Sequence, residues 1–332
     1  MTQATASATY ESEVAGWKAL VLENEFLRVT SLPGYGGWIL SVVYRPRDVE
    51  LLWQSPRGVI HRDDAPVVTD PLQQYKARSP GAWPEIFPHG SVATRVKGVT
   101  IPFHGEVVSR AWRCEVVEPE GRRVSARLTV DCHLMPLRLE RTMILEAGRP
   151  VLRLEETASN LCADPVEFMW GHHPIFGKPL LGEGSRIHAP AGSTLGDDFD
   201  PGGWPDRDGR DMSLAPLEGS GVSDMFYLSD MSAGWLALNN PGIDLGAALS
   251  WDREVFPYVW IWRDAGGARD WPYFGRAYTT ALEPFSSLPG ARERGERLLR
   301  LEGNAAMSTA LNLTAFEGLE EVSAVSPEGD VS

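Results

Sequence analysis

The sequence has no run of eighteen apolar residues and contains little cysteine and little lysine. Without such a run, no membrane-spanning helix and no membrane partner are expected. The opening stretch MTQATASATYESEVAGWKAL has no basic start followed by an apolar segment, so no signal peptide is expected. Three scattered cysteines (Cys114, Cys132 and Cys162) suit reduced thiols better than a disulfide framework, which predicts a cytoplasmic protein.

Positive charge is also scarce. The 31 lysine and arginine residues stand against 45 aspartate and glutamate residues, which gives a net charge of −14. Because binding to a phosphate backbone requires a basic patch, no nucleic-acid partner is expected. The chain has no GxSxG, no GxGxxG after a strand, no phosphate loop, no HExxH and no paired-cysteine motif. These absences remove the most direct hydrolase, dehydrogenase and kinase interpretations, and they give no reason to expect a cofactor or a metal.

The pattern that dominates the chain is that of β-strands. The segment RRVSARLTVDCHL alternates apolar and polar residues, and LRLERTMIL and PVLRLEETASNL repeat the period of two. Gly148, Arg149 and Pro150 separate the last two segments, which is typical of a hairpin. There is no convincing long amphipathic helix. The chain is therefore predicted to be all-β, with regularly spaced strands that suggest a large antiparallel β-sandwich.

No linker or fixed-period repeat divides the chain, and a single β-sandwich domain is predicted over residues 13–316. Residues 1–12 are small and polar, so a flexible N-terminus is expected there. Residues 317–332 are acidic with few aromatic side chains, and a mobile acidic tail is expected. The sequence is compatible with a monomer or a homodimer.

Several titratable residues lie in apolar or turn-forming surroundings instead of in charged runs. His104 lies in IPFHGEVVSRAW, His172 and His173 in WGHHPIFG, and Glu283 in YTTALEPFSSLPG. Burial raises the pKa of a carboxyl group and lowers that of an imidazole, which suits both for acid–base catalysis near neutral pH. The alternative for each is a hydrogen-bonded structural role. The two adjacent histidines face opposite ways on an extended strand, so one of them is expected to face a site, and a shared metal is not expected.

Tryptophan is abundant, with twelve residues. Many stand beside polar residues in turn-rich segments, as Trp262 does in YVWIWRDAGGARDWPYFGRAY. An aromatic ring at a strand end can stack on the apolar face of a sugar ring, although simple packing explains many single tryptophans equally well.

Four segments, taken in order, resemble the aldose 1-epimerase (galactose mutarotase-like) superfamily. They are GYGGWILSVVYRPRDVELLWQSP, IPFHGEVVSRAWRCEVVE, WGHHPIFG and GRAYTTALEPFSSLPG, and the correspondence spans about residues 20 to 315. The resemblance implies the galactose mutarotase-like supersandwich, a concave face that binds a small-molecule sugar, and no cofactor. It also implies that Glu283 is the general base, that His173 is the general acid, and that His104 binds the sugar near its ring oxygen.

The sequence departs from the family pattern in a way that identifies a divergent member. The usual Asn-Arg dyad is absent, and GAWPEIFPHG stands in its place. The residues that could bind substrate here are Glu85, His89, His172, Trp262, Arg263, Asp264 and Arg276.

Three functions remain open on the sequence. The first is an aldose 1-epimerase that interconverts the α and β anomers of a sugar or sugar derivative. The second is a lyase or isomerase acting on an oxidised sugar or glycoside on the same scaffold, suggested by the unmatched WPEIFPHG segment and by His172. The third is a non-catalytic carbohydrate-binding protein, which the tryptophan content would serve equally well.

Overall fold

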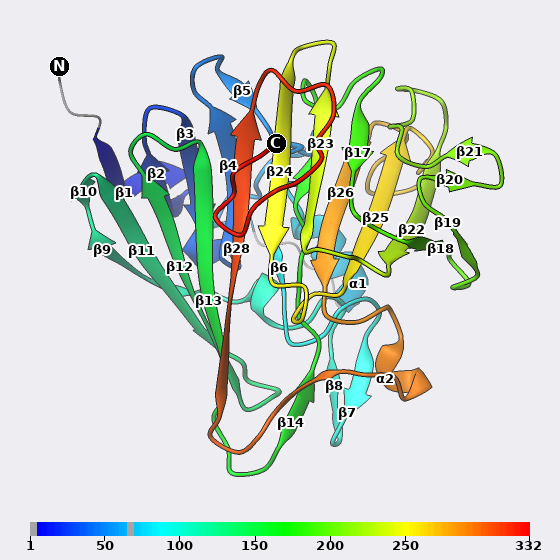
Figure 1. Cartoon of the computed structure of the whole chain (residues 1–332). Coiled ribbons are helices and arrows are strands. Elements are labelled where there is room, and N and C mark those ends of the chain that lie inside the picture. Colours follow the sequence, from blue (N-terminus) through cyan, green and yellow to red (C-terminus); the bar gives the residue numbers. More distant parts are fainter. Residues whose placement is uncertain (1–4, 65–69) are drawn as a thin grey trace.

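A computed structural model describes residues 5–64 and 70–332, and these form a β-sandwich of large antiparallel sheets (Figure 1). The all-β prediction is confirmed. Among the described residues, no helix has the length and apolar character needed to cross a membrane. The two α-helices found in the described part of the chain are short: α1 spans Pro71–Arg78 and α2 spans Ala291–Arg294.

The described residues form three large sheets, which we number in chain order. The second sheet contains the strands that the sequence indicated most clearly. Its neighbours β11, β12 and β13 pair antiparallel along their whole lengths, and residues 148–150 make the predicted hairpin between β12 and β13. Inward-facing residues of these strands are buried in the main core. The strand order is β17 (Arg186–His188), β23 (Trp235–Asn240), β24 (Leu245–Trp251), β28 (Ala306–Phe316), β13 (Val151–Asn160), β12 (Leu137–Glu146), β11 (Arg123–Asp131) and β9 (Arg113–Glu118).

The first sheet covers one half of this second sheet, with β1, β2 and β3 in contact with β11, β12 and β13. It is built almost entirely from the N-terminal fifty residues. Its order is β10 (Glu120–Gly121), β1 (Ala6–Val14), β2 (Trp17–Glu23), β3 (Leu27–Leu32), β4 (Trp38–Tyr44) and β5 (Val49–Glu50).

The third sheet positions the site. Strands β25 and β26 pair so that Trp260 faces Glu283 and Ile261 faces Leu282. Because side chains alternate between the faces of a strand, Ile261 and Leu282 enter the main core while Trp260 and Glu283 lie on the opposite face. The order is β19 (Pro201–Gly203), β18 (Ser193–Leu195), β22 (Ser223–Ser229), β25 (Tyr258–Ala265), β26 (Tyr278–Phe285), β15 (Gly171–His172) and β6 (Glu85–Ile86), and β16 (Ile175–Phe176) also pairs with β26.

The remaining elements are short. They are the pairs β7 (Thr94–Val96) with β8 (Val99–Ile101), β14 (Val166–Phe168) with β27 (Leu299–Leu301), and β20 (Asp206–Arg207) with β21 (Arg210–Asp211), and the 3₁₀ turns η1 (Pro33–Tyr35) and η2 (Val107–Ser109).

Both predicted flexible ends differ from the structure. Residues 6–12, expected to be flexible, form most of β1, because alternate side chains such as Ala6 and Ala8 are buried against the core. Residues 1–4 of that predicted segment lie outside the described residues.

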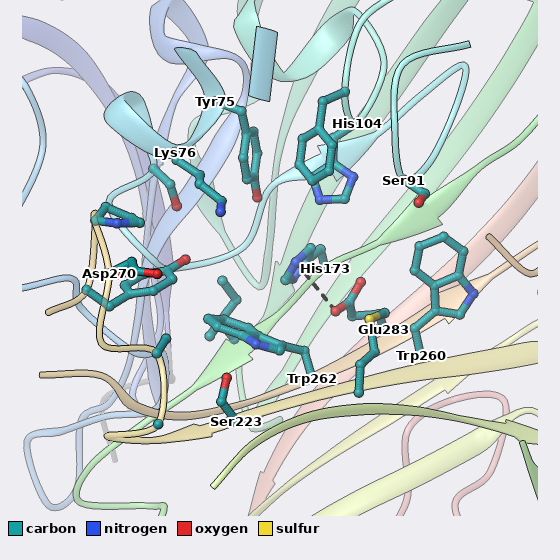
Figure 2. Close-up of a pocket in the computed structure, with 18 of the residues that line it drawn as sticks. Tyr75, Lys76, Ser91, His104, His173, Ser223, Trp260, Trp262, Asp270 and Glu283 are labelled. Carbon is teal, nitrogen blue, oxygen red and sulfur yellow. Dashed lines mark ion pairs between the residues drawn. The ribbon is translucent and has the colours of Figure 1, made fainter. Parts of the chain in front are cut away.

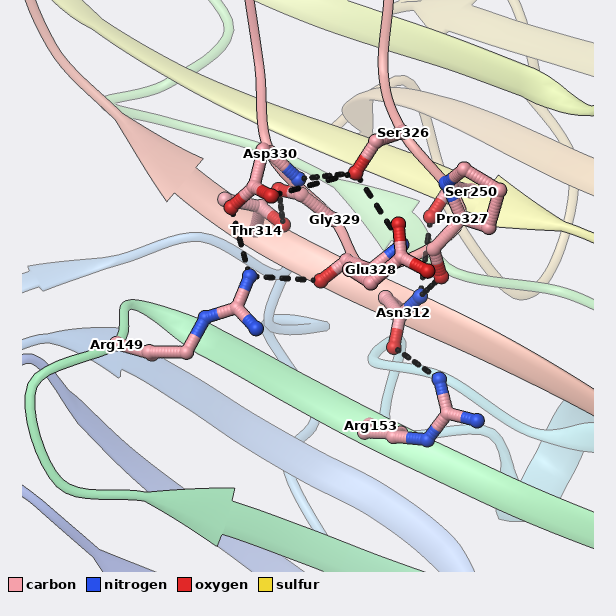
Figure 3. Close-up of polar contacts among 10 residues, drawn as sticks. All are labelled: Arg149, Arg153, Ser250, Asn312, Thr314, Ser326, Pro327, Glu328, Gly329 and Asp330. Atoms are coloured by element: carbon pink, nitrogen blue, oxygen red, sulfur yellow. Dashed lines mark hydrogen bonds and ion pairs between the residues drawn. The ribbon is translucent and has the colours of Figure 1, made fainter.

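The predicted mobile tail, residues 317–332, folds back over β28 (Figure 3). The Asn312 side chain donates to the carbonyl of Pro327 at 2.8 Å, and the Thr314 hydroxyl donates to that of Gly329 at 2.7 Å. Arg149 forms an ion pair with Asp330 at 2.7 Å. Composition predicted mobility here because it does not reveal partners supplied by a distant strand.

Candidate functional site

A cavity of about 600 Å³ opens on the face of the third sheet that carries Glu283 (Figure 2). Strands β22, β25 and β26 form its floor, and α1, residues 103–104 and the segment 267–273 form its walls. This volume is within the usual range for small-molecule sites. The side chains that line it include Tyr75, Lys76, Ser91, Phe103, His104, His173, Ser223, Met225, Tyr227, Trp260, Trp262, Arg269, Asp270, Trp271, Tyr273 and Glu283.

His173 and Glu283 face each other in this cavity, with 3.4 Å between His173 Nε2 and Glu283 Oε1 (Figure 2). Glu283 projects from β26, and His173 directly follows β15, the neighbouring strand. The two strands approach closely at Gly171, where an added Cβ would lie 2.4 Å from the ring of Phe285. A glycine before the histidine pair therefore helps to set the distance between the two functional groups.

His104 comes from a distant part of the chain and lies beside His173, with 5.7 Å between the ring centres. Tyr75 from α1 packs edge-on against His104 at 4.7 Å, and the ring of Phe103 lies 3.8 Å away. The φ of His104 is 61°, a left-handed conformation that is uncommon for a residue other than glycine. Such conformations cluster at functional sites.

Burial shifts the pKa values of Glu283, His173 and His104. It raises the pKa of Glu283 well above its ordinary value, lowers the pKa of His173 to about 4, and lowers the pKa of His104 well below its ordinary value. The Nδ1 atoms of His104 and His173 are buried and have no hydrogen-bond partner among the described residues. Buried polar groups are ordinarily hydrogen-bonded, so these two nitrogens are exceptions, and both belong to residues that line the cavity.

His172 has surroundings of the opposite kind. It is fully buried, with Nδ1 3.1 Å from a carboxylate oxygen of Glu85 and Nε2 3.0 Å from one of Glu156. Arg141 contacts both carboxylates, at 2.6 Å for Glu156, and the Trp170 indole donates to Glu85. We call Glu85, Arg141, Glu156 and His172 the buried ionic network.

The buried ionic network is close to charge balance. Burial by itself lowers the pKa of His172, but the carboxylates of Glu85 and Glu156 outweigh it and raise the pKa to about 9. Burial also opposes ionisation of Glu156, but His172 and Arg141 bring its pKa down to about 2. One atom each of Glu85, Glu156 and His172 lies within 4.8 Å of the others, a spacing that could hold a cation. The Arg141 guanidinium already supplies the positive charge there.

The predicted substrate-binding residues divide between the cavity and other places. Trp262 lines the cavity, whereas Glu85 and His172 are enclosed in the buried ionic network. His89 does not line the cavity, and its Nε2 is 2.8 Å from the carbonyl oxygen of Val92.

The three remaining predicted residues are also outside the cavity lining. Arg263 is buried on the other face of β25 and forms an ion pair with Asp224 at 2.7 Å. The carboxylate of Asp264 accepts hydrogen bonds from the backbone N–H groups of residues 266–268. Arg276 is exposed. Substrate binding by these residues through direct contact with the cavity is not supported by this arrangement.

Some lining residues were missed by sequence reasoning. Tyr75 and Lys76 lie on α1, whose start was marked in the sequence: Asp70 caps it by accepting from the N–H of Gln73, and Pro71 is the first helical residue. The buried ionic network also left a signal. Arg141 and Glu156 occupy inward positions in the alternation of β12 and β13, and they are direct cross-strand neighbours.

The chain has the β-sandwich fold of solved structures that are described as aldose 1-epimerase candidates and galactose mutarotase-like proteins. The chain belongs to the family described as a domain of unknown function, DUF4432, whose model matches residues 14–314. No curated protein matches the chain.

Three solved structures illustrate the likeness in fold. A candidate aldose 1-epimerase from Klebsiella pneumoniae is 17% identical, with a TM-score of 0.73 over 96% of this chain and 85% of that one. The Slr1438 protein from Synechocystis is 20% identical, with a TM-score of 0.68 over 93% and 100%. A galactose mutarotase-like protein from Clostridium acetobutylicum is 12% identical, with a TM-score of 0.66 over 94% and 98%. At these identities the likeness concerns the fold alone.

Proposed function

We propose that this protein is an aldose 1-epimerase that interconverts the anomers of a free sugar or sugar derivative. The observation that carries the proposal is the meeting of His104, His173 and Glu283 in one cavity, with 3.4 Å between His173 and Glu283. Three widely separated segments of the sequence supply these groups. The resemblance of the fold to galactose mutarotase-like proteins supports the same reaction.

Anomer exchange needs one proton donor and one proton acceptor. The acceptor takes the proton of the C1 hydroxyl, the donor protonates the ring oxygen, and the C1–O5 bond breaks to leave a carbonyl at C1. Rotation about the C1–C2 bond followed by ring closure, with the two roles exchanged, yields the other anomer. Each group of the pair therefore acts once as acid and once as base, with no covalent intermediate.

The His173–Glu283 pair provides for this exchange with a single proton. Burial raises the pKa of Glu283 well above its ordinary value and lowers that of His173 to about 4, and both shifts favour the neutral forms, with the shared proton on Glu283. For Glu283 to begin as the base, as the family resemblance suggests, this proton first moves to His173. In the opposite order, Glu283 protonates the ring oxygen and His173 accepts from C1.

The remaining cavity residues would position the sugar. Trp262 and Tyr273 have ring centres 5.6 Å apart and offer apolar surface for a pyranose face. His104, which lines the cavity, would bind the sugar near its ring oxygen, as the resemblance implies. Glu85 and His172, which suggested a lyase or isomerase, belong to the buried ionic network, so no specific observation favours that alternative.

The proposal is tested by exchange spectroscopy with NMR, which measures the rate between anomer signals at equilibrium. The wild-type protein is expected to accelerate exchange over buffer for at least one member of a panel of neutral and anionic sugars. Glu283→Gln and His173→Asn should each lower the rate while leaving sugar binding measurable by calorimetry. Binding without acceleration in the wild-type protein would instead indicate a carbohydrate-binding protein.

A further inference from the structure

The charges around the cavity differ from those of the chain as a whole. The chain has a net charge of −14, yet two of the four charged side chains that line the cavity are the cations Lys76 and Arg269. The other two are Asp270 and Glu283, and burial raises the pKa of Glu283, which favours its neutral form. Half of the charged side chains that line the cavity are therefore cations, although the chain as a whole is strongly acidic.

Neither cation has a carboxylate partner. Across residues 5–64 and 70–332, no carboxylate oxygen lies within 4.0 Å of Lys76 or Arg269, although Asp270 lines the same cavity. The buried arginines outside the cavity do have carboxylate partners. Arg263 pairs with Asp224 at 2.7 Å, and Arg141 pairs with Glu156 at 2.6 Å. In the view of Figure 2, Lys76 and Asp270 both lie to the left of His173, and Trp260 lies to its right.

The backbone under Lys76 is held in place. Tyr75, the preceding residue, is buried against Trp38 and His104, with ring centres 6.0 and 4.7 Å away. The Arg57 guanidinium donates to the carbonyl groups of Lys76 and Ala77. Only the lysine side chain itself is left to be ordered by a ligand, which lowers the entropic cost of binding.

The backbone before Arg269 is fixed by a separate device. The buried carboxylate of Asp264 accepts hydrogen bonds from the N–H groups of Gly266, Gly267 and Ala268, at 2.9, 3.2 and 3.1 Å. Arg269 directly follows this turn and lines the same cavity as Lys76. Thus the two cations come from distant segments and converge on one space.

A further cation lies close to the cavity. The Arg57 guanidinium lies 5.8 Å from the ring centre of Trp271, which lines the cavity. Positive charge at this place attracts anions, and the attraction is strongest at low ionic strength.

We propose that the substrate is a sugar bearing an anionic substituent, a carboxylate, phosphate or sulfonate, which Lys76 and Arg269 bind while C1 lies at His173 and Glu283. This inference rests on the proposed function for the placement of C1 only. The anion is held by charge-assisted hydrogen bonds, which are the stronger ones in proteins. A neutral sugar would leave both cations without partners in the cavity.

The test measures binding and exchange separately. Isothermal titration calorimetry and NMR anomer exchange are run with glucose, glucose 6-phosphate, glucuronate and 6-deoxy-6-sulfoglucose, so that the arms distinguish the three anions. The variants are Lys76→Met, which keeps the apolar stem, and Arg269→Gln. Lys18→Met, at an exposed position on β2 in the first sheet, is the matched control.

We expect at least one anionic sugar to bind more tightly than glucose. Each cavity variant should raise its Kd about 10- to 100-fold, the range for a charged hydrogen bond, and should change glucose binding less than twofold. Lys18→Met should have no effect. Tighter binding of glucose than of every anion, or an equal loss for neutral and anionic sugars in Lys76→Met, would overturn the inference.

Failure of the inference and failure of the proposed function give different results. Selective anion binding that Lys76→Met abolishes, without anomer exchange by the wild-type protein, would support the anion site and refute the epimerase. Rapid exchange of glucose that is unchanged in Lys76→Met, with no preference for anions, would support the epimerase and refute the anion site.

Discussion

Two neighbouring histidines show how differently one fold can treat the same side chain. His172 lies between two carboxylates that outweigh the effect of its burial and raise its pKa to about 9. His173 faces the cavity, and burial lowers its pKa to about 4. The alternation of a strand separates them, since it directs one ring into the buried ionic network and the other to Glu283. In the buried ionic network each charge has a partner of opposite charge, whereas the cavity contains polar groups without such partners.

The same contrast holds for the glutamates. Glu156 is held by Arg141 and His172, and its pKa falls to about 2. Glu283 is equally buried but has only the imidazole of His173 within ion-pair distance among the described residues, and its pKa rises. A carboxyl group that is easily protonated and deprotonated suits acid–base chemistry, whereas a permanently ionised one suits structure.

Replacement of Glu283 by glutamine should have the largest effect on activity. The amide keeps the shape of the side chain but cannot exchange a proton, so we expect the anomer-exchange rate to fall about 10²- to 10⁴-fold. Since no buried ion pair is lost, thermal unfolding should change little. NMR exchange and circular dichroism melting measure the two quantities. A stable variant that keeps full activity would contradict the assignment of Glu283.

Replacement of Glu156 by glutamine should give the opposite result. It leaves the buried positive charges of Arg141 and His172 with one carboxylate, and breaking a buried ion pair costs about 3–5 kcal/mol of unfolding free energy. Urea denaturation measures this loss. Glu155→Gln on the exposed face of the same strand is the control and should change stability by less than about 0.5 kcal/mol. Equal effects of the two substitutions would mean that the network is not a structural one.

Much of this contrast follows from the alternation of apolar and polar residues in the sequence. The period of two predicted the strands of the second sheet, and it also places Arg141 and Glu156 on the apolar face, where charged residues need partners. The same alternation in WIWRD separates Trp262 from Arg263: if one faces a sugar, the other enters the core. The pattern itself therefore places the predicted substrate-binding residue Arg263 on the face of β25 opposite Trp262.

Other parts of the site depend on contacts that no local pattern contains. The meeting of His104 with His173 joins segments about seventy residues apart, and only the family resemblance brought them together beforehand. Asp264 was predicted to bind substrate, but its carboxylate accepts hydrogen bonds from the backbone of the following turn. Lys76 and Arg269 were not singled out because their convergence depends on how α1 lies over the third sheet.

The pH dependence of activity should reflect the protonation of the His173–Glu283 pair. Exchange requires one proton on the pair. Below about pH 4, His173 is protonated while Glu283 keeps its proton, so no base remains. We therefore expect kcat/KM to fall about tenfold per pH unit below pH 4, and to fall again above the raised pKa of Glu283, where no acid remains. The measurement is the NMR exchange rate at each pH, corrected for buffer. A profile that is flat from pH 5 to pH 3 in folded protein would contradict this prediction.

The smallest expected effect is the change of the unfolding free energy with pH, which should reflect the titration of His172. Its pKa rises from 6.5 to about 9 in the folded protein, so its stabilising contribution is complete below pH 6.5 and is lost as the pH rises through 9. Between pH 7 and 8.5 this one group should lower the unfolding free energy by at most about 1.4 kcal/mol per pH unit.

Glu283, whose pKa is also raised, contributes a slope of the same sign, so the comparison must be made between variants. His172→Gln should flatten the slope measured by urea denaturation, whereas His173→Gln should leave it unchanged, because the folded-state pKa of His173 is below this range. If both variants keep the wild-type slope, His172 is not charged in the folded protein and the contrast between the two histidines fails.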